Sequence, residues 1–498
     1  MAKKLLSPGI SILKYTGRAL FPEVFGLGKI NAKFMGRWEK KRLFSPTNKG
    51  LVINGTTQRL SENDSFRNLA MIASTGWGKT SGYIIPNILT QNTGSMVITD
   101  PSGALFKQTS GALQKKGYHV KILNPLDLEH SIRFNPFSGL NSYSEVDEIA
   151  HILVQTANPD AKDPFWNQGA EMIISILART LRRHPKGYKY ANLANILHLL
   201  NNFEDGTPLN PFISKYADSQ TYSQYKGFIS NAPNTLQGLL STAKVSLKAI
   251  ADPDIARLTA YSTFKFEELR SQKTALFLVF PQNKLSYYSF LMNLFYTKLF
   301  HYCLDNNTFT GNSLPIYFLL DEFGHLTIPH FSSIITTTRQ RNISISIILQ
   351  SISQLEARYG KNDAHTILHG GVATRIFSPG LDTQTNQMLA QTLGTKRQEI
   401  TTSEDVIQVK DDPILEAYQI RTMQDREALF LFANKKPIKL SITRHFENRT
   451  LFKQTQQKPA TIPVHTPYKL CFLPLKRNTD SSHSHKRRTR GTHHQHQP

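Results

Sequence analysis

The sequence contains little cysteine and no long apolar run. Its 498 residues include only Cys303 and Cys471, which lack metal-ligand spacing and exclude a disulfide framework, so the chain fits a reducing, cytoplasmic setting. The longest apolar runs, such as residues 274–280 and 343–349, are far shorter than the roughly 20 residues that cross a bilayer. We therefore expect no transmembrane segment in this chain.

Acidic residues are scarce relative to basic ones, and the shortage is concentrated at the two ends. The sequence has 59 Lys and Arg against 36 Asp and Glu, a formal net charge of +23. Residues 1–50 carry a net charge of +9 and residues 435–498 a net charge of +12, so the middle is nearly neutral. Both ends are expected to face a polyanion, either nucleic acid or an anionic membrane, with solvated tails as the alternative.

One glycine-containing loop follows an apolar strand and precedes a helical stretch, as a phosphate-binding P-loop does. The strand is expected over residues 68–72 and the helix over residues 79–89. The loop consists of Ala73, Ser74, Thr75, Gly76, Trp77, Gly78, Lys79 and Thr80. Gly76 and Gly78 permit backbone angles that turn successive N–H groups toward phosphate oxygens. The positive end of the helix dipole points at the same oxygens.

The last two residues of the loop predict binding of ATP and Mg²⁺. Lys79 can reach the β- and γ-phosphates, and the Thr80 hydroxyl can ligate Mg²⁺. One residue departs from the pattern, because Ala73 stands where the first glycine is expected. Alanine is tolerated there if its φ angle is negative.

The alternation of strands and helices predicts an α/β fold with a parallel sheet covered on both faces. This pattern occupies residues 51–145 and returns over residues 266–436 as a discontinuous nucleotide-binding domain. Residues 146–265 show only helical periodicity and predict an all-α insertion domain. Residues 1–50 form a basic N-terminal segment. Residues 437–498 form a basic C-terminal tail, expected to be largely disordered because the periodicity fades.

Polar residues follow two later strands and are expected to meet the P-loop at the carboxyl edge of the sheet. Asp321 follows an apolar strand, as a Walker B carboxylate does, and would hold Mg²⁺. Glu322 can act as the general base on water, and Gln350 can contact the γ-phosphate or that water. The alternative for the acids is a solvated strand end. Arg339 and Arg341 are candidates for an arginine inserted from a neighbouring subunit, or are surface charges.

Several further motifs accompany these residues. They are residues 73–80, 85–89, 100–103, 133–136, 163–166, 321–323 and 350–355. Together they resemble the type IV secretion coupling proteins, the TraG/TraD-type conjugation ATPases, across about residues 65 to 435. Three features depart from the family: Ala73, the residues Ser102 and Ala104 where Lys and Glu are usual, and the lack of transmembrane helices.

The resemblance implies a RecA-like P-loop NTPase domain with an inserted all-α domain, assembled as a homo-hexamer around DNA. It implies a DNA-stimulated ATPase in which Lys79 and Thr80 bind nucleotide, Asp321 holds Mg²⁺ and Glu322 activates water. It favours Arg339 over Arg341 as the arginine finger, from its spacing to Gln350. The partners it implies are a relaxase with its single-stranded DNA and the secretion channel.

The missing membrane anchor leaves the location and two other functions open. We expect peripheral attachment at the cytoplasmic face of the bacterial inner membrane, through residues 1–50 or a separate anchor subunit. One alternative is a cytoplasmic DNA translocase of the FtsK/HerA type. The other is a substrate adaptor that binds ATP without hydrolysing it.

Overall fold

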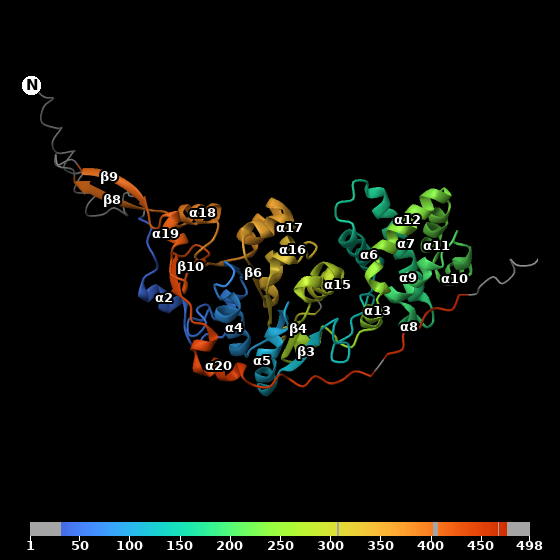
Figure 1. Cartoon of the computed structure of the whole chain (residues 1–498), viewed down its shortest axis with the longest axis horizontal. Helices are drawn as coiled ribbons and strands as arrows, with labels where there is room; N and C mark the ends of the chain where they lie inside the picture. Colours follow the sequence, from blue (N-terminus) through green and yellow to red (C-terminus); the bar gives the residue numbers. More distant parts are fainter. Residues whose placement is uncertain (1–30, 306–307, 402–406, 467, 476–498) are drawn as a thin grey trace, which may run out of the picture.

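A computed structural model describes residues 31–305, 308–401, 407–466 and 468–475. An α/β part and a helical part lie side by side in it (Figure 1). The α/β part is built on a nine-stranded sheet with the order β11-β10-β7-β1-β6-β5-β2-β4-β3. Its strands are β1 (Leu69–Ile72), β2 (Ser95–Thr99), β3 (His119–Leu123), β4 (Thr274–Leu278), β5 (Ile316–Leu320), β6 (Ile343–Leu349), β7 (Thr374–Phe377), β10 (Glu427–Phe432) and β11 (Ile438–Ser441).

Both faces of the sheet are buried under helices, as its unbroken apolar strands require. The covering helices are α15 (Leu285–Leu304) on one face and α4 (Ile85–Thr90) and α5 (Ala104–Lys115) on the other. Side chains of β1 alternate between the two cores. Ala70 and Ile72 lie in the core that contains α15, and Leu69 and Met71 lie in the core that contains α4 and α5.

The strands from β7 to β3 in the sheet order are parallel, so their carboxyl ends share one edge. Ile72 at the end of β1 pairs with Leu349 of β6 and Phe377 of β7. Leu320 at the end of β5 pairs with Ile347 of β6. The residues that follow β1, β5 and β6 are therefore close together, as the sequence predicts.

The helical part lies between β3 and β4 in the chain and confirms the predicted all-α insertion. Its helices are α6 (Tyr143–Ala157), α7 (Pro164–Arg183), α8 (Gly187–Tyr190), α9 (Leu193–Asn201), α10 (Asn210–Tyr216), α11 (Ser219–Ile229), α12 (Pro233–Ser246) and α13 (Pro253–Leu258). Their apolar stripes pack into the same core as the α15 face of the sheet. The insertion is therefore joined to the sheet by a shared core.

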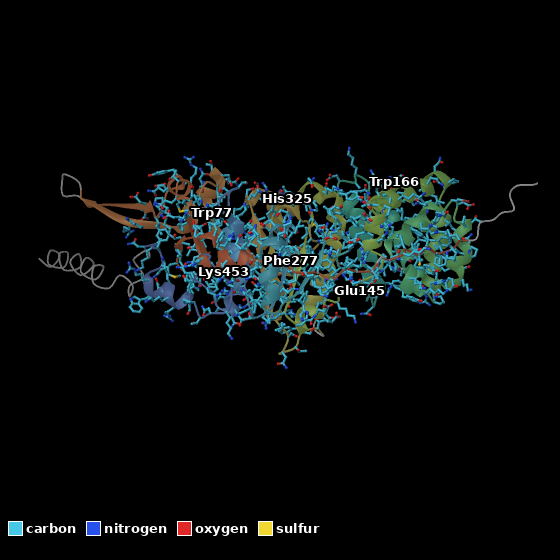
Figure 2. The ribbon with its side chains drawn as sticks, turned by 60° about the horizontal axis from the view of Figure 1, so that its bottom comes forward. Trp77, Glu145, Trp166, Phe277, His325 and Lys453 are labelled. Atoms are coloured by element: carbon cyan, nitrogen blue, oxygen red, sulfur yellow. The ribbon has the colours of Figure 1, made fainter. Side chains whose placement is uncertain are left out.

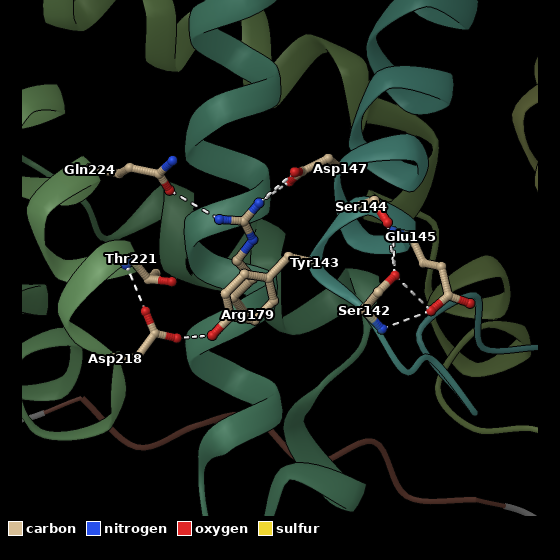
Figure 3. A network of polar contacts seen from close by, with 9 residues as sticks. All are labelled: Ser142, Tyr143, Ser144, Glu145, Asp147, Arg179, Asp218, Thr221 and Gln224. Atoms are coloured by element: carbon tan, nitrogen blue, oxygen red, sulfur yellow. Dashed lines mark hydrogen bonds and ion pairs between the residues drawn. The ribbon is translucent and has the colours of Figure 1, made fainter.

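A polar network fixes three helices of the insertion against one another (Figure 3). Arg179 of α7 is buried, pairs with Asp147 of α6, and donates to Gln224 Oε1 of α11 at 3.0 Å. Its guanidinium also lies over the Tyr143 ring, 4.6 Å from the centroid. Asp218, which caps α11, accepts a hydrogen bond from the Tyr143 hydroxyl. A buried charge that is paired in this way specifies one arrangement of the helices.

Part of the predicted N-terminal segment belongs to the α/β part. Residues 31–50 contain the helix α2 (Arg37–Leu43), and Met35 N–H donates to Pro437 O at 2.8 Å. Phe44 is buried against Phe430 of β10, with ring centroids 5.3 Å apart. For these residues the structure supports packing on the main domain. Residues 1–30 lie outside the described part of the chain.

The prediction that residues 437–498 are largely disordered is wrong for most of that range. β11 closes the sheet after Pro437, and α20 (Arg449–Thr455) packs on α5. The chain then runs along the sheet to the helical part (Figure 1). Its turns and short apolar segments carry no periodicity, which explains the error. Residues 476–498 lie outside the described part.

A hairpin of β8 (Thr395–Thr401) and β9 (Ile407–Pro413) was not predicted, because its strands are largely polar. The remaining α-helices are α3 (Glu62–Ser65), α14 (Glu268–Ser271), α16 (Phe331–Thr337), α17 (Ile352–His365), α18 (Thr383–Leu393) and α19 (Ala417–Arg421). Across the described ranges, no helix combines the length and the apolar character that a membrane span needs.

Candidate nucleotide-binding site

The predicted P-loop leaves the carboxyl end of β1 and lies in the α/β part, where Figure 2 labels Trp77. Gly76 and Gly78 have φ angles of +80° and +107°, which side chains rarely adopt. Ala73 is not among the described residues with positive φ, so alanine fits in place of the expected glycine. Its N–H donates to Leu349 O at 3.0 Å, which ties the start of the loop to β6.

The loop is held open on one side and packed on the other. Thr75 and Gly76 are exposed, and a Cβ added at Gly76 would meet nothing within 4 Å. Ser74 N–H donates to Ser378 Oγ at 3.0 Å, which fixes the loop to the segment after β7. Trp77 points inward and is 7% exposed, packed in the core that contains α4. The exposed backbone N–H groups of this fixed loop can therefore bind an anion.

Lys79 is folded back onto the loop. Its Nζ donates to Ala73 O at 2.8 Å and to Ser74 O at 3.3 Å. Burial lowers the pKa of Lys79, and the charges of Asp321 and Glu322 act in the opposite direction. A phosphate at the loop would supply the negative charge that two carbonyl oxygens only partly provide.

The helix after the loop starts as a π-type turn over Thr80–Ile84 and continues as α4. Lys79 itself has helical backbone angles, so the helix begins where it was predicted. Asn87 of α4 accepts from Val52 N–H and donates to Val52 O, each at 2.8 Å, so it clamps residues 51–53 against the helix. Within the motif of residues 85–89, Asn87 therefore holds residues 51–53 on α4.

Asp321 meets Thr80 at the carboxyl edge of the sheet. Thr80 Oγ1 donates to Asp321 Oδ2 at 3.4 Å, across β6 and 241 positions apart in sequence. Asp321 is buried, and burial, with the nearby charge of Glu322, raises its pKa to about 6. A hydroxyl and a carboxylate side by side are oxygen ligands of the kind that Mg²⁺ takes. The residues fit the predicted metal.

Glu322 is held in a strained turn next to Asp321. Its φ of +52° is left-handed, and its N–H donates to Asp321 Oδ1 at 3.0 Å. Its Oε2 accepts from Gln282 Nε2 at 2.8 Å and lies 3.7 Å from His325 Nε2. Strain of this kind is common at functional sites. Gln282 follows β4, and the sequence reasoning missed it although it too is a polar residue after a strand.

Gln350 lies next to the site, and its backbone is held by a residue that was not predicted. It follows Leu349, whose carbonyl accepts from Ala73 N–H, so it is next to the P-loop. Gln354 Oε1 accepts from Gln350 N–H at 3.1 Å. A Cβ added at Gly324 would lie 2.8 Å from the same oxygen, so Gly324 allows Gln354 to sit between two loops. Gln350 precedes α17 and Gln354 lies in its first turn, so no helix-face pattern marked Gln354.

Arg339 and Arg341 lie at the opposite edge of the sheet from the P-loop. Both precede β6, whose seven residues span about 23 Å. Arg339 is exposed and, within the described ranges, its side chain makes no hydrogen bond or ion pair. Arg341 is partly buried, and its carbonyl accepts from Arg270 at 2.8 Å. Neither arginine can reach the nucleotide site of its own chain.

One basic residue near the P-loop escaped the sequence reasoning entirely. Arg444 follows β11, in the stretch predicted as a tail, and its Nη2 donates to Trp77 O at 3.2 Å. No motif marks this position. Only the folding of the chain back onto the loop brings it there.

Known proteins resemble this chain in sequence. VirD4 of Rhizobium radiobacter is 24% identical over 424 residues, which are 80% of this chain and 60% of VirD4. The conjugal transfer protein TraG of Escherichia coli is 24% identical over 326 residues, which are 59% of this chain and 50% of TraG. The chain therefore spans between half and two thirds of the length of these relatives.

Solved structures resemble it in fold. Bacterial conjugative coupling protein TrwBdeltaN70, in an unbound form, has a TM-score of 0.64 at 17% identity and covers 84% of this chain and 95% of its own. The plasmid coupling protein TrwB in complex with ADP and Mg²⁺ has a TM-score of 0.63, also at 17% identity, and covers 84% and 94%. This likeness confirms the expected RecA-like domain with an all-α insertion. A family model described as type IV secretory system conjugative DNA transfer matches residues 30–469, and the chain belongs to that family.

Proposed function

We propose that this chain is an ATP-driven coupling protein, which recruits a relaxase bound to single-stranded DNA and drives that DNA into a type IV secretion channel. The observation that carries the proposal is the contact between Thr80 and Asp321. It joins the P-loop to a strand-end acid 241 positions away. The complexes of TrwB with ADP and Mg²⁺ and with an ATP analogue support the same nucleotide and metal here.

Each residue of the site has a role in this proposal. The N–H groups of residues 74–80 and the Lys79 ammonium bind the phosphates. Thr80 and Asp321 hold Mg²⁺, which when bound neutralises charge on the phosphate oxygens. Glu322 takes the proton of the attacking water, and Gln350 orients the γ-phosphate or that water. Arg339 of a neighbouring copy, in a homo-hexamer, supplies positive charge to the transition state.

ATP turnover with and without DNA tests this function. The full chain is expected to hydrolyse ATP slowly alone and several-fold faster with single-stranded DNA. Faster turnover with duplex than with single-stranded DNA would instead favour a translocase of the FtsK/HerA type. Nucleotide binding without turnover under every DNA condition would favour the non-hydrolysing adaptor.

The affinity for Mg²⁺ is expected to fall as the pH drops through about 6. Asp321 binds a proton below its raised pKa of about 6 and must lose it to ligate Mg²⁺. Between about pH 7 and pH 5 the affinity should fall by up to about tenfold in the wild type relative to Asp321→Asn. Titration of Mg²⁺ in the presence of ADP measures this. Protonation of the nucleotide is common to both proteins and cancels, so parallel profiles would contradict the role of Asp321.

The proposed location is the cytoplasmic face of the bacterial inner membrane, as a peripheral protein. Attachment would use the basic N-terminal residues or a separate anchor subunit. Met35 and Phe44 fix this segment to the sheet, but α2 exposes Trp38 and its basic residues, so the N-terminal contact is assigned to residues 1–50. Sedimentation with anionic vesicles tests this: equal binding by residues 1–498 and 51–498 would leave attachment to a partner subunit.

A further inference from the structure

The residues after β11 form a C-terminal strap, defined here as residues 442–466 and 468–475. It starts at the P-loop, includes α20, and runs beneath the sheet to the helical part (Figure 1). One continuous segment therefore touches the nucleotide site and the all-α insertion. Three sets of contacts hold it in place.

The first contact seats the strap beside the P-loop, where Gly55, Gly78 and Gly82 leave room for it. A Cβ at Gly55 would lie 2.0 Å from Thr443 O, and a Cβ at Gly82 would lie 2.6 Å from the Ile442 side chain. A Cβ at Gly78 would lie 3.1 Å from Arg444 Nε. His445 Nδ1 also donates to Ser81 O at 3.3 Å. Side chains at these glycines would clash with residues 442–444, so the sequence is adapted to this contact.

Arg444 lacks a counter-charge at this contact. Its Nη2 donates to Trp77 O, and the side chain is partly buried. Glu447 is near in sequence, but its carboxylate accepts from the Arg444 backbone N–H at 3.1 Å and pairs with Arg426 at 2.6 Å. Within the described ranges no carboxylate forms an ion pair with the Arg444 guanidinium. Because the Arg444 guanidinium is partly buried, has no carboxylate partner and lies beside a phosphate-binding loop, an anion is its expected partner.

The second contact holds the middle of the strap against α5. A Cβ at Gly111 would lie 1.9 Å from Lys458 O, so this glycine too makes room for the strap. Ala460 N–H donates to Ser110 Oγ at 3.0 Å. Farther along, His465 N–H donates to Glu129 O at 2.8 Å. The strap thus follows one path across the α/β part.

The third contact docks the end of the strap on α9 of the insertion. Asn195 is fully buried, and its side chain accepts from Leu473 N–H at 2.8 Å and donates to Cys471 O at 3.0 Å. His198 Nε2 donates to Leu473 O at 3.1 Å, and Leu473 is buried in the core of the insertion. These contacts satisfy both backbone groups of Leu473, as a neighbouring strand would.

We propose that Arg444 binds the phosphates of the nucleotide and that the strap conveys nucleotide occupancy to the all-α insertion. This inference rests on the proposed nucleotide function of the P-loop. Arg444 lies beside Gly78, and its Nη2 donates to Trp77 O within the glycine turn of the loop. Its proposed contact is with the α- or β-phosphate, which ADP and ATP share. A phosphate contact fixes the start of the strap, which lowers the entropic cost of docking its far end.

The phosphate contact is tested by binding of adenosine, ADP and ATP to the full chain. Arg444→Gln should weaken ADP and ATP equally, by about tenfold, the size of one charge-assisted hydrogen bond. Arg444→Lys should restore part of the loss. Adenosine binding should not change, whereas a merely structural role would weaken all three ligands. Arg449→Gln, an exposed arginine at the start of α20, is the matched control. Wild-type affinity for ADP in Arg444→Gln would overturn the proposal.

The coupling is tested with a native thiol of the strap. Cys471 is partly exposed, and the second cysteine, Cys303, is buried, with its pKa raised to about 12 by burial. Saturating Mg·ADP should slow the reaction of Cys471 with a maleimide at least threefold in the wild type, because the strap end docks more firmly. The effect should be absent in Arg444→Gln at saturating ADP. No effect in the wild type, or an equal effect in the variant, would overturn the coupling.

Thermodynamic reciprocity supplies a second test of the coupling. Asn195→Ala leaves two backbone groups of the strap unpaired and should undock its end. Because coupling between sites is mutual, this distant change should weaken ADP binding as well. Unchanged ADP affinity with a more reactive Cys471 would overturn the coupling. A wild-type chain that binds no nucleotide would instead refute the proposed function, which separates the two failures.

Discussion

Replacing Glu322 with glutamine is expected to reduce ATP turnover by about 10²- to 10⁴-fold, the range for loss of a general base. The nucleotide affinity should stay within about threefold of the wild type. Glutamine has nearly the same shape, and its amide oxygen can still accept from Gln282, which holds Glu322 at 2.8 Å. The substitution therefore removes the basic carboxylate at position 322 and keeps the position of the side chain.

Steady-state hydrolysis and equilibrium binding of a fluorescent ATP analogue measure the two quantities. Glu356→Gln on the neighbouring helix α17 is the matched control, since it also removes one carboxylate and should leave turnover unchanged. Turnover by Glu322→Gln within tenfold of the wild type would show that another group takes the proton of the water.

Replacing Arg339 with alanine should reduce turnover by about 10³-fold or more, the range for an arginine finger. Binding of ATP to the isolated chain should not change, because Arg339 lies at the far edge of the sheet from its own P-loop. Its side chain is exposed, as a residue that acts on a neighbouring copy must be. Arg341→Ala is the control for loss of a nearby positive charge.

A mixing experiment separates action in trans from damage to the fold. Arg339→Ala chains retain a complete P-loop, and Lys79→Ala chains retain the arginine. Mixed together, the two inactive proteins should recover part of the turnover at their shared interfaces. No recovery, or a larger loss in Arg341→Ala than in Arg339→Ala, would contradict the assignment of Arg339.

The sequence predicted the sheet and the main site because both depend on local patterns. The apolar run of residues 343–349 is β6, and the strand expected over residues 68–72 is β1, which begins one residue later. The P-loop, Asp321, Glu322 and Gln350 all follow such strands, and parallel strands place their carboxyl ends at one edge. The structure brings these residues together as expected.

Residues whose positions depend on long-range packing could not be predicted. Arg444 has no local pattern, and its place at the P-loop follows from the close approach to Gly55, Gly78 and Gly82. Gly111 and Asn195 fix the path of the strap in the same way, from more than 250 positions away. The polar strands of the β8–β9 hairpin lack the apolar alternation that marks a half-buried strand.

Equilibrium binding of Mg·ATP to the full chain and to Lys79→Ala tests the central claim most directly. The wild type should bind one nucleotide per chain. Lys79→Ala should bind it at least about tenfold more weakly, as expected for the loss of a charged hydrogen bond to phosphate. Lys107→Ala, an exposed lysine on α5, should bind like the wild type. Equal affinity in Lys79→Ala and the wild type would contradict the assignment of this loop as the ATP site.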